Sequence, residues 1–200
     1  MSSLFLTFDD GPDRRWTPAV LDALDAVGAR ATFFVVAPRA VAQPHLVARM
    51  QAGGHTVQLH CDEHVRHTQM QDSEIAEDTR RAMERLHTLG VHPNRWRTPW
   101  GISTTGTQAV AREHGLQLVH WTADTEDWAA HAVDVMLARV EPRIKDGAIV
   151  LAHDGLGPGA LRPGCADTVD LVTPLVALAR QRGLECLPLG DPSTPAQVAA

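Results

Sequence analysis

The chain has 200 residues, the length of one ordinary domain, and 44% of them are hydrophobic while 21% are charged. It can therefore bury a core, and intrinsic disorder is excluded as its class. The formal net charge is −6, from 24 acidic and 18 basic residues, and no Lys/Arg run forms a basic patch, which argues against nucleic acid and anionic membranes as partners.

Targeting and redox signals are sparse. The N-terminus enters an apolar strand at once, without the charged and apolar regions of a signal peptide. We therefore expect a cytoplasmic protein, or one from which a signal has been removed. No apolar run is long enough to span a bilayer. The three scattered cysteines, Cys61, Cys165 and Cys186, predict no disulfide framework.

Strand-like and helix-like patterns alternate along the chain. Apolar periodicity and turn residues predict, in chain order, a strand at 4–8, a helix at 17–27, a strand at 31–36, a helix at 38–51, a strand at 56–59, a helix that opens at Asp72 and ends before Gly90, an extended piece near Trp96, a helix at 105–114, a strand at 116–121, a helix at 133–140, a strand at 148–152, a helix at 168–182 and a strand at 184–187.

This alternation predicts parallel β-α units. About seven units in 200 residues are short of an eight-unit barrel, which typically takes ~250 residues. We therefore expect an α/β fold, a shortened or distorted (β/α) barrel in one domain over residues 1–190. Periodicity alone leaves an open sheet as the alternative. Residues 191–200 are expected to form a flexible tail.

Polar clusters follow the predicted strands at five places. They are Asp9 with Asp10, His60 with His64, residues 97–101, Asp124 with Asp127, and His153 with Asp154. Reactive groups of parallel β/α folds gather at the carboxyl ends of the strands. Five clusters on one rim therefore indicate an active site there.

Two histidines, His60 and His64, stand four residues apart. On a helix this spacing places both imidazoles on one face, and a carboxylate would complete a three-ligand metal site with an open position. The alternative is a pair of surface histidines in a polar loop, which is favoured for this motif alone. Asp10 lies at the end of a neighbouring predicted strand, and this third potential ligand favours a metal site over a pair of surface histidines.

Asp9 and Asp10 are adjacent acids before Gly11-Pro12. On an extended chain their side chains point in opposite directions, so one can bind metal while the other acts as a base. The alternative is an ordinary Asp-Gly-Pro turn in which both acids bond to local backbone.

Five motifs occur in order between residues 7 and 154. They are Thr7-Phe8-Asp9-Asp10-Gly11-Pro12 with Ala31-Thr32-Phe33-Phe34-Val35, Gly54-His55-x-Val57-x-x-His60-x-x-x-His64, Arg97-Thr98-Pro99-Trp100-Gly101, Asp124-Thr125-Glu126-Asp127-Trp128, and Ile149-Val150-Leu151-Ala152-His153-Asp154. With them the chain resembles the polysaccharide deacetylase family, carbohydrate esterase family 4, which includes chitin, peptidoglycan and nodulation-factor deacetylases.

The resemblance implies a divalent metal held by Asp10, His60 and His64. Zinc is the default ion for this ligand set, and other divalent ions are accepted by two-histidine, one-carboxylate sites. It further implies that Asp9 is the general base and that Arg97 holds it ionised through an ion pair.

The same resemblance assigns the remaining site residues. His153 is the general acid that protonates the leaving amine, and Asp127 orients it. The backbone N–H of Trp100 helps to stabilise the oxyanion, while Trp128 and Leu151 wall the pocket for the acyl methyl group.

Three positions depart from the family pattern, and none removes a ligand or an acid-base group. Cys61 stands where Ser or Thr is usual, Val65 replaces a common proline, and Trp100 replaces a more frequent tyrosine. Cys61 raises the question of oxidation or metal inhibition beside the site.

The implied function is metal-dependent removal of an N-acetyl group from an amino sugar or another N-acetylated saccharide. The alternatives are an amidohydrolase of the same fold acting on an allantoin-like or cyclic-imide-like amide, and a non-catalytic saccharide-binding relative. The expected partner is thus an N-acetylated saccharide or a small amide. The sequence leaves the substrate, the native metal and the oligomeric state open.

Overall fold

The computed structural model describes residues 2–190, so the tail predicted at 191–200 lies outside the described residues. In chain order the strands and α-helices are β1 (Ser3–Asp9), α1 (Trp16–Val27), β2 (Thr32–Val36), α2 (Ala37–Ala42), α3 (Pro44–Ala52), β3 (Thr56–Cys61), α4 (Asp72–His87), β4 (Arg95–Trp96), α5 (Thr105–Glu113), β5 (Gln117–Leu118), β6 (Ala123–Asp124), α6 (Val133–Val140), β7 (Ile149–His153), α7 (Ala166–Gln181) and β8 (Glu185–Cys186). The short 3-10 helices are η1 (His67–Gln69), η2 (Pro99–Gly101), η3 (Asp127–Ala129) and η4 (Glu141–Arg143).

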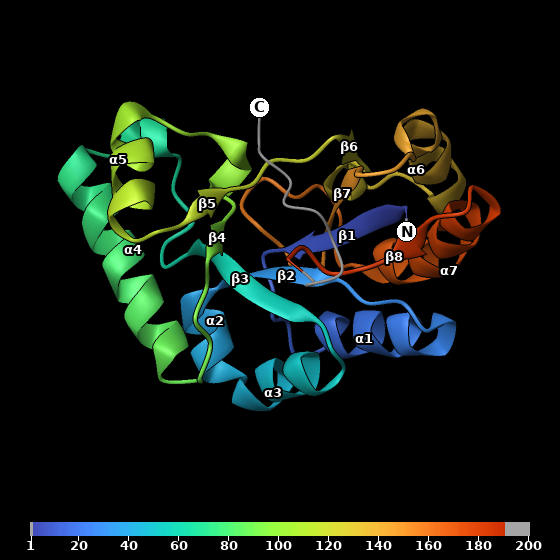
Figure 1. Ribbon diagram of the computed structural model, residues 1–200, viewed down its shortest axis with the longest axis horizontal. Coiled ribbons are helices and arrows are strands. Elements are labelled where there is room, and N and C mark those ends of the chain that lie inside the picture. Colours follow the sequence, from blue (N-terminus) through green and yellow to red (C-terminus); the bar gives the residue numbers. More distant parts are fainter. Residues whose placement is uncertain (1, 191–200) are drawn as a thin grey trace.

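The strands form one parallel sheet, in which β1 pairs with β2, β7 and β8. Their order is β5-β4-β3-β2-β1-β7-β6, and β8 pairs with the first residues of β1. The register sets Asp9 of β1 opposite both Phe34 of β2 and His153 of β7. Although β5 and β6 are consecutive in the chain, they form opposite ends of this order, so the sheet curls into a half-barrel (Figure 1). The predicted distorted barrel in a single domain is confirmed.

Alternation along β1 decides which residues face the site. Leu4, Leu6 and Phe8 belong to the large core under the helices, whereas Phe5 joins a smaller cluster inside the curl of the sheet. Because side chains of a strand alternate between its faces, Thr7 and Asp9 share the inner face with Phe5. Asp9 therefore points into the barrel at the strand end.

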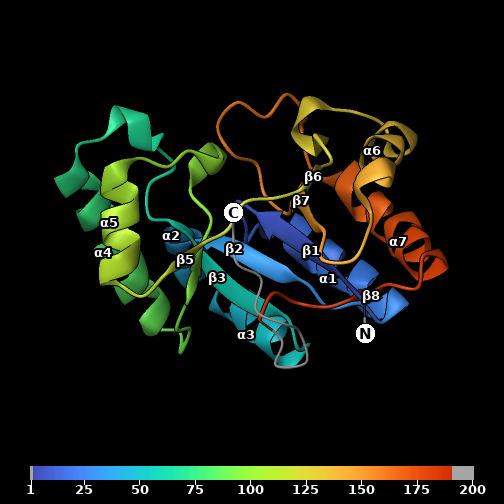
Figure 2. The ribbon, with the colours of Figure 1, turned by 45° about the horizontal axis from the view of Figure 1, so that its top comes forward.

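The helices pack side by side around the outside of the sheet. α1 packs against α7 and α3, α2 against α4, and α4 against α5, while α6 packs against α7. In Figure 2 the green pair α4 and α5 lies at one side and α6 with α7 at the other, and the loop after β7 arches between them. No helix among the described residues is long and apolar enough to cross a membrane.

The single helix predicted at 38–51 is wrong. The structure has two helices, α2 and α3, with Gln43 at φ −133°, ψ 55° between them. Pro44 begins α3, and a proline disfavours the helical conformation of the residue before it.

The strand predicted at 116–121 is also shorter than expected. Only Gln117 and Leu118 form β5, and a separate strand, β6, pairs with β7. The carbonyls of Val119 and His120 instead accept hydrogen bonds from the Arg97 guanidinium, at 3.4 and 3.2 Å. The N–H of Val119 still donates to the Trp96 carbonyl of β4 at 2.9 Å, but the carbonyls of this stretch bond to a side chain inside the barrel.

Candidate active site

A cleft of about 520 Å³ opens where the strands end. The predicted site residues that line it are Asp9, Asp10, His60, His64, Trp100, Trp128, Leu151 and His153. Arg97 and Asp127 are buried behind this lining, where they bond to Asp9 and His153. The fold thus brings all ten predicted residues together in or directly behind one cleft.

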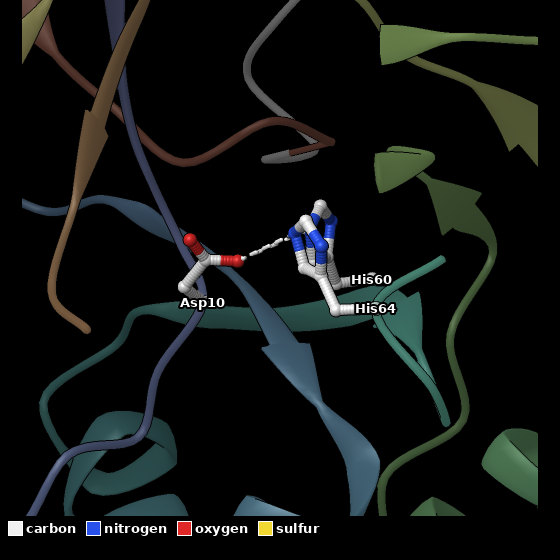
Figure 3. A group of neighbouring side chains, drawn as sticks. All are labelled: Asp10, His60 and His64. Atoms are coloured by element: carbon white, nitrogen blue, oxygen red, sulfur yellow. Dashed lines mark ion pairs between the residues drawn. The ribbon is translucent and has the colours of Figure 1, made fainter. Parts of the chain in front are cut away.

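Asp10, His60 and His64 direct their side chains at one another (Figure 3). Oδ1 of Asp10 lies 3.3 Å from Nε2 of His60 and 3.0 Å from Nε2 of His64. The interpretation of the histidine spacing as a helical face is wrong. His60 belongs to strand β3, and His64 lies in the loop beyond it. The loop bends His64 back beside His60.

The donor set fits a divalent cation. Nδ1 of His60 lies 2.7 Å from the carbonyl of Arg97, and only a protonated nitrogen can bond to a carbonyl, so in the neutral ring Nε2 carries the lone pair that faces Asp10. Oδ1 of Asp10 is buried and has no hydrogen-bond partner. The three ligand atoms lie within 4.8 Å of one another. One carboxylate and two imidazoles are a usual ligand set for zinc and related ions.

The Asp10 carboxylate is held in its charged form. Burial alone would raise its pKa, but the contacts with His60 and His64 keep the pKa well below its ordinary value. For His60, burial lowers the pKa, yet Asp10 and Asp9 outweigh burial and raise it. A metal at this site therefore competes with a proton for His60.

Arg97 fixes the second acid, Asp9. Its guanidinium is fully buried and donates from Nη1 to Oδ1 of Asp9, at 2.9 Å, and to the hydroxyl of Thr7, at 2.6 Å. Asp9 thus has a different partner from Asp10, but not because both acids are extended: β1 ends at Asp9, and Asp10 has φ 72° in the turn that follows. Sequence reasoning missed Thr7, although it stands in the first motif and shares the inner face of β1 with Asp9.

His153 and Asp127 form a hydrogen-bonded pair. Nδ1 of His153 lies 2.7 Å from Oδ1 of Asp127, and the His153 backbone N–H donates to Oδ2 at 2.9 Å. Burial disfavours both charges. Asp127 nevertheless raises the pKa of His153 to about 9, and His153 with Arg162 lowers the pKa of Asp127 to about 2. At neutral pH the His153 imidazole is therefore protonated on both nitrogens. Its Nδ1–H bonds to Asp127, and its Nε2–H can contact another group.

Two residues that sequence reasoning missed complete this pair. Thr168, in α7, donates to Oδ2 of Asp127 at 2.7 Å, and Nη1 of Arg162 lies 3.0 Å from the same oxygen. Arg162 also donates to the His153 carbonyl at 3.2 Å. It stands in the glycine-rich stretch after β7, residues 155–164.

Aromatic side chains form the walls of the cleft. Trp100 lies edge-on to His64, with ring centroids 4.4 Å apart, in backbone with φ 55°. Trp128, which is 39% exposed, and Leu151 also line the cleft. Trp121 is a further aromatic residue of the lining.

Other singled-out residues have structural contacts. The Trp96 indole donates to the carbonyl of His60 at 2.9 Å, and His67, whose pKa burial lowers to about 4, bonds to Thr107. Cys61 is buried, and burial raises the pKa of its thiol well above the ordinary value. The thiol is therefore protonated and poorly reactive.

Comparisons with known proteins agree with this geometry. Residues 1–119 match the family model described as polysaccharide deacetylase. A chitooligosaccharide deacetylase from Bradyrhizobium sp. (strain ANU 289) is 37% identical over 195 residues, which cover 94% of this chain and 89% of that protein. A peptidoglycan-N-acetylglucosamine deacetylase from Listeria monocytogenes is 36% identical over 150 residues, 74% of this chain and 32% of that one.

Comparison with solved structures indicates the same family. The family 4 carbohydrate esterase from Streptomyces lividans in complex with acetate matches with a TM-score of 0.85 and 28% identity, over 96% of this chain and 95% of that one. The chain belongs to the polysaccharide deacetylase family.

Proposed function

We propose that this protein removes the acetyl group from N-acetylglucosamine units of chitooligosaccharides. One observation carries the proposal: three metal-ligand side chains, an Arg-held carboxylate and an Asp-held histidine converge on one cleft. The chain is a sugar N-deacetylase, a hydrolase of carbon-nitrogen bonds. The match of a chitooligosaccharide deacetylase over almost the whole chain supports this saccharide class.

Asp10, His60 and His64 would hold the metal, which we take to be Zn²⁺. A divalent ion there would polarise the acetamide carbonyl and lower the pKa of a water molecule toward neutrality. The chain's own contribution is to present three lone pairs in fixed positions. The Arg97 carbonyl sets the His60 tautomer, and the buried Asp10 stays ionised.

Asp9 acts as the general base. Its Oδ1 accepts a hydrogen bond from Arg97, which keeps the carboxylate oriented toward the cleft. A carboxylate so placed can take a proton from the attacking water while Asp10 remains a ligand.

His153 acts as the general acid. An amine leaves poorly unless it is protonated, and His153, with a pKa of about 9, holds a proton at neutral pH. Asp127 accepts from Nδ1, so Nε2–H is the group that can face the substrate nitrogen. The backbone N–H of Trp100 would help to stabilise the oxyanion, and Trp128 and Leu151 would wall the pocket for the acyl methyl group.

A substrate panel tests the proposal. Purified protein loaded with Zn²⁺ is assayed for released acetate with N-acetylated chitooligosaccharides of increasing length, UDP-N-acetylglucosamine and acetamide, and for the ring-opened acid with allantoin. We expect acetate from the oligosaccharides, and none from the Asp10→Asn control. Ring opening of allantoin with no attack on any saccharide would overturn the saccharide assignment in favour of a non-sugar amidohydrolase.

The identity of the metal is tested separately. Chelator-treated protein is reloaded with Zn²⁺, Co²⁺, Mn²⁺ or Mg²⁺, and bound metal and turnover are measured on the same sample. The two imidazole ligands favour Zn²⁺ and Co²⁺ over Mg²⁺, which prefers oxygen ligands. Restoration by Mg²⁺ alone would contradict the choice of zinc.

A further inference from the structure

Arg39 connects the backbone of a metal ligand to the loop after β7. It lies in α2, half-buried, and donates from Nη1 to the carbonyl of Asp10 at 2.6 Å and from Nη2 to the carbonyl of Leu156 at 3.0 Å. The two terminal nitrogens of its guanidinium thus donate to two carbonyls from segments that are far apart in the sequence.

The loop that Arg39 holds packs directly on Asp10. A Cβ built on Gly157 would fall 2.1 Å from Oδ2 of Asp10, and one built on Gly155 would fall 2.6 Å from the Asp10 carbonyl. Both positions therefore need glycine, because any side chain would displace the carboxylate or its backbone. This gives the glycine-rich stretch after β7 a specific function beside the site.

Asp10 itself needs external support. Its φ is +72°, in the left-handed region that an L-residue with a side chain rarely adopts. Such a conformation persists only where the surroundings impose it. The Arg39 bond to the Asp10 carbonyl and the close packing of Gly155 and Gly157 are the contacts that do so on this side.

We propose that Arg39 is a positioning residue for the metal ligand Asp10, acting by clamping the glycine-rich loop onto it. The inference rests on the metal site of the proposed function. Removing a partner that orients a metal ligand typically costs about 10–100-fold in metal affinity. Because Arg39 contacts the Asp10 backbone and not its carboxylate, we expect the lower end, about 10-fold.

Charge repulsion alone predicts the opposite change in metal affinity. Arg39 is a cation next to a cation site, so its removal without any change in geometry would tighten metal binding. Weaker binding in Arg39→Ala would therefore report positioning. Arg39→Lys keeps the charge but lacks the rigid fork that reaches both carbonyls, so its affinity is expected between those of the wild type and Arg39→Ala.

The experiment measures Zn²⁺ dissociation constants by chelator competition and the visible spectrum of the Co²⁺-loaded protein. Its control is Arg182→Ala, since Arg182 also bridges two backbone carbonyls, those of Glu141 and Ile144, at 2.5 and 2.8 Å. We expect about 10-fold weaker Zn²⁺ binding and an altered Co²⁺ spectrum in Arg39→Ala only, with similar losses of Tm in both variants. Unchanged or tighter Zn²⁺ binding in Arg39→Ala would overturn the proposal, as would equal weakening in Arg182→Ala.

A second pair of variants keeps the proposal testable if Arg39→Ala does not fold. Gly157→Ala crowds Oδ2 of Asp10, whereas Gly164→Ala, in the same loop region, would crowd the ring of Trp16 at 2.3 Å. Loss of Zn²⁺ affinity in Gly157→Ala alone supports the loop contact through which Arg39 is proposed to act, and equal affinities contradict the proposal. If the wild-type protein binds no stoichiometric Zn²⁺, the proposed function falls as well; if it binds and Arg39→Ala binds equally, only the positioning role falls.

Discussion

The two sides of the cleft compensate their buried charges in different ways. On one side Asp10, His60 and His64, the metal-ligand group, direct their ligand atoms toward one another, and Oδ1 of Asp10 has no hydrogen-bond partner. On the other side both oxygens of Asp127 are used, by His153, Thr168 and Arg162. The first group fits a divalent cation, whereas in the second both oxygens of Asp127 already have donors and His153 is protonated at neutral pH.

The two groups differ in their partners because their residues belong to different segments of the chain. The metal ligands belong to the ends of β1 and β3 and to the loops that directly follow. Asp127 instead receives a guanidinium from the loop after β7 and a hydroxyl from α7. A buried charge without partners costs several kcal/mol, so each group needs either a metal or its own counter-charge. The variants below test that division.

Loss of a metal ligand should have the largest effect. His60→Ala removes one of three ligands, so stoichiometric metal and activity are expected to disappear together, beyond the ~10–100-fold typical of outer partners. Metal content by atomic spectroscopy and acetate release are measured on one sample, with exposed His87→Ala as the control. Full activity in a metal-free preparation would remove the metal from the mechanism.

Asp9→Asn should separate the base from the ligands. Metal is expected to stay bound, while turnover falls by ~10²–10⁴-fold because the base is lost. Arg97 then lies buried without its counter-charge, so Tm is expected to fall as well. Loss of metal in Asp9→Asn, with retention in Asp10→Asn, would show that the roles of the two acids are reversed.

His153→Ala tests whether the second group delivers a proton. The variant should lose ~10²–10⁴-fold on an N-acetyl amide but much less on an activated acetate ester, whose leaving group needs no protonation. Rates on both substrates are compared at saturating Zn²⁺. Equal losses on the two would assign His153 to binding or structure.

Asp127→Asn should act through the His153 proton. Asp127 raises the pKa of His153 to about 9, and protonated His153 is the active form below that pH. Without the carboxylate the proton is held less firmly, so the alkaline limb of the rate profile should move down by about one to three pH units. An unmoved alkaline limb would mean that His153 does not set it.

Thr168→Val should give the smallest effect. It removes one donor to Asp127, a hydrogen bond to a charged group worth about 1.5–3 kcal/mol. The depressed pKa of Asp127 stabilises the fold above its unfolded pKa, and that stability is lost as pH falls toward about 2. With a donor removed, the pKa rises and acid unfolding should begin at higher pH. Thr168→Ser, which keeps the hydroxyl, is the control.

Much of this protein could be predicted from its sequence. Strand periodicity and the turn residues after each strand are local signals, so they placed Asp9, His60 and His153 at strand ends, and parallel strands bring such ends to one rim. Five short motifs in family order then predicted the ligand, base and acid residues.

Tertiary structure alone decided how those residues are supported. Thr168 lies 41 residues from Asp127, and Arg39 lies 117 residues from Leu156, so no local pattern relates them. The His60 tautomer depends on a carbonyl 37 residues away. The early end of β5 depends on bonds from the Arg97 guanidinium inside the barrel. Such contacts arise from the packing of distant segments, because a side chain's partner is set by proximity in space, whereas periodicity records only the side of an element on which the residue lies.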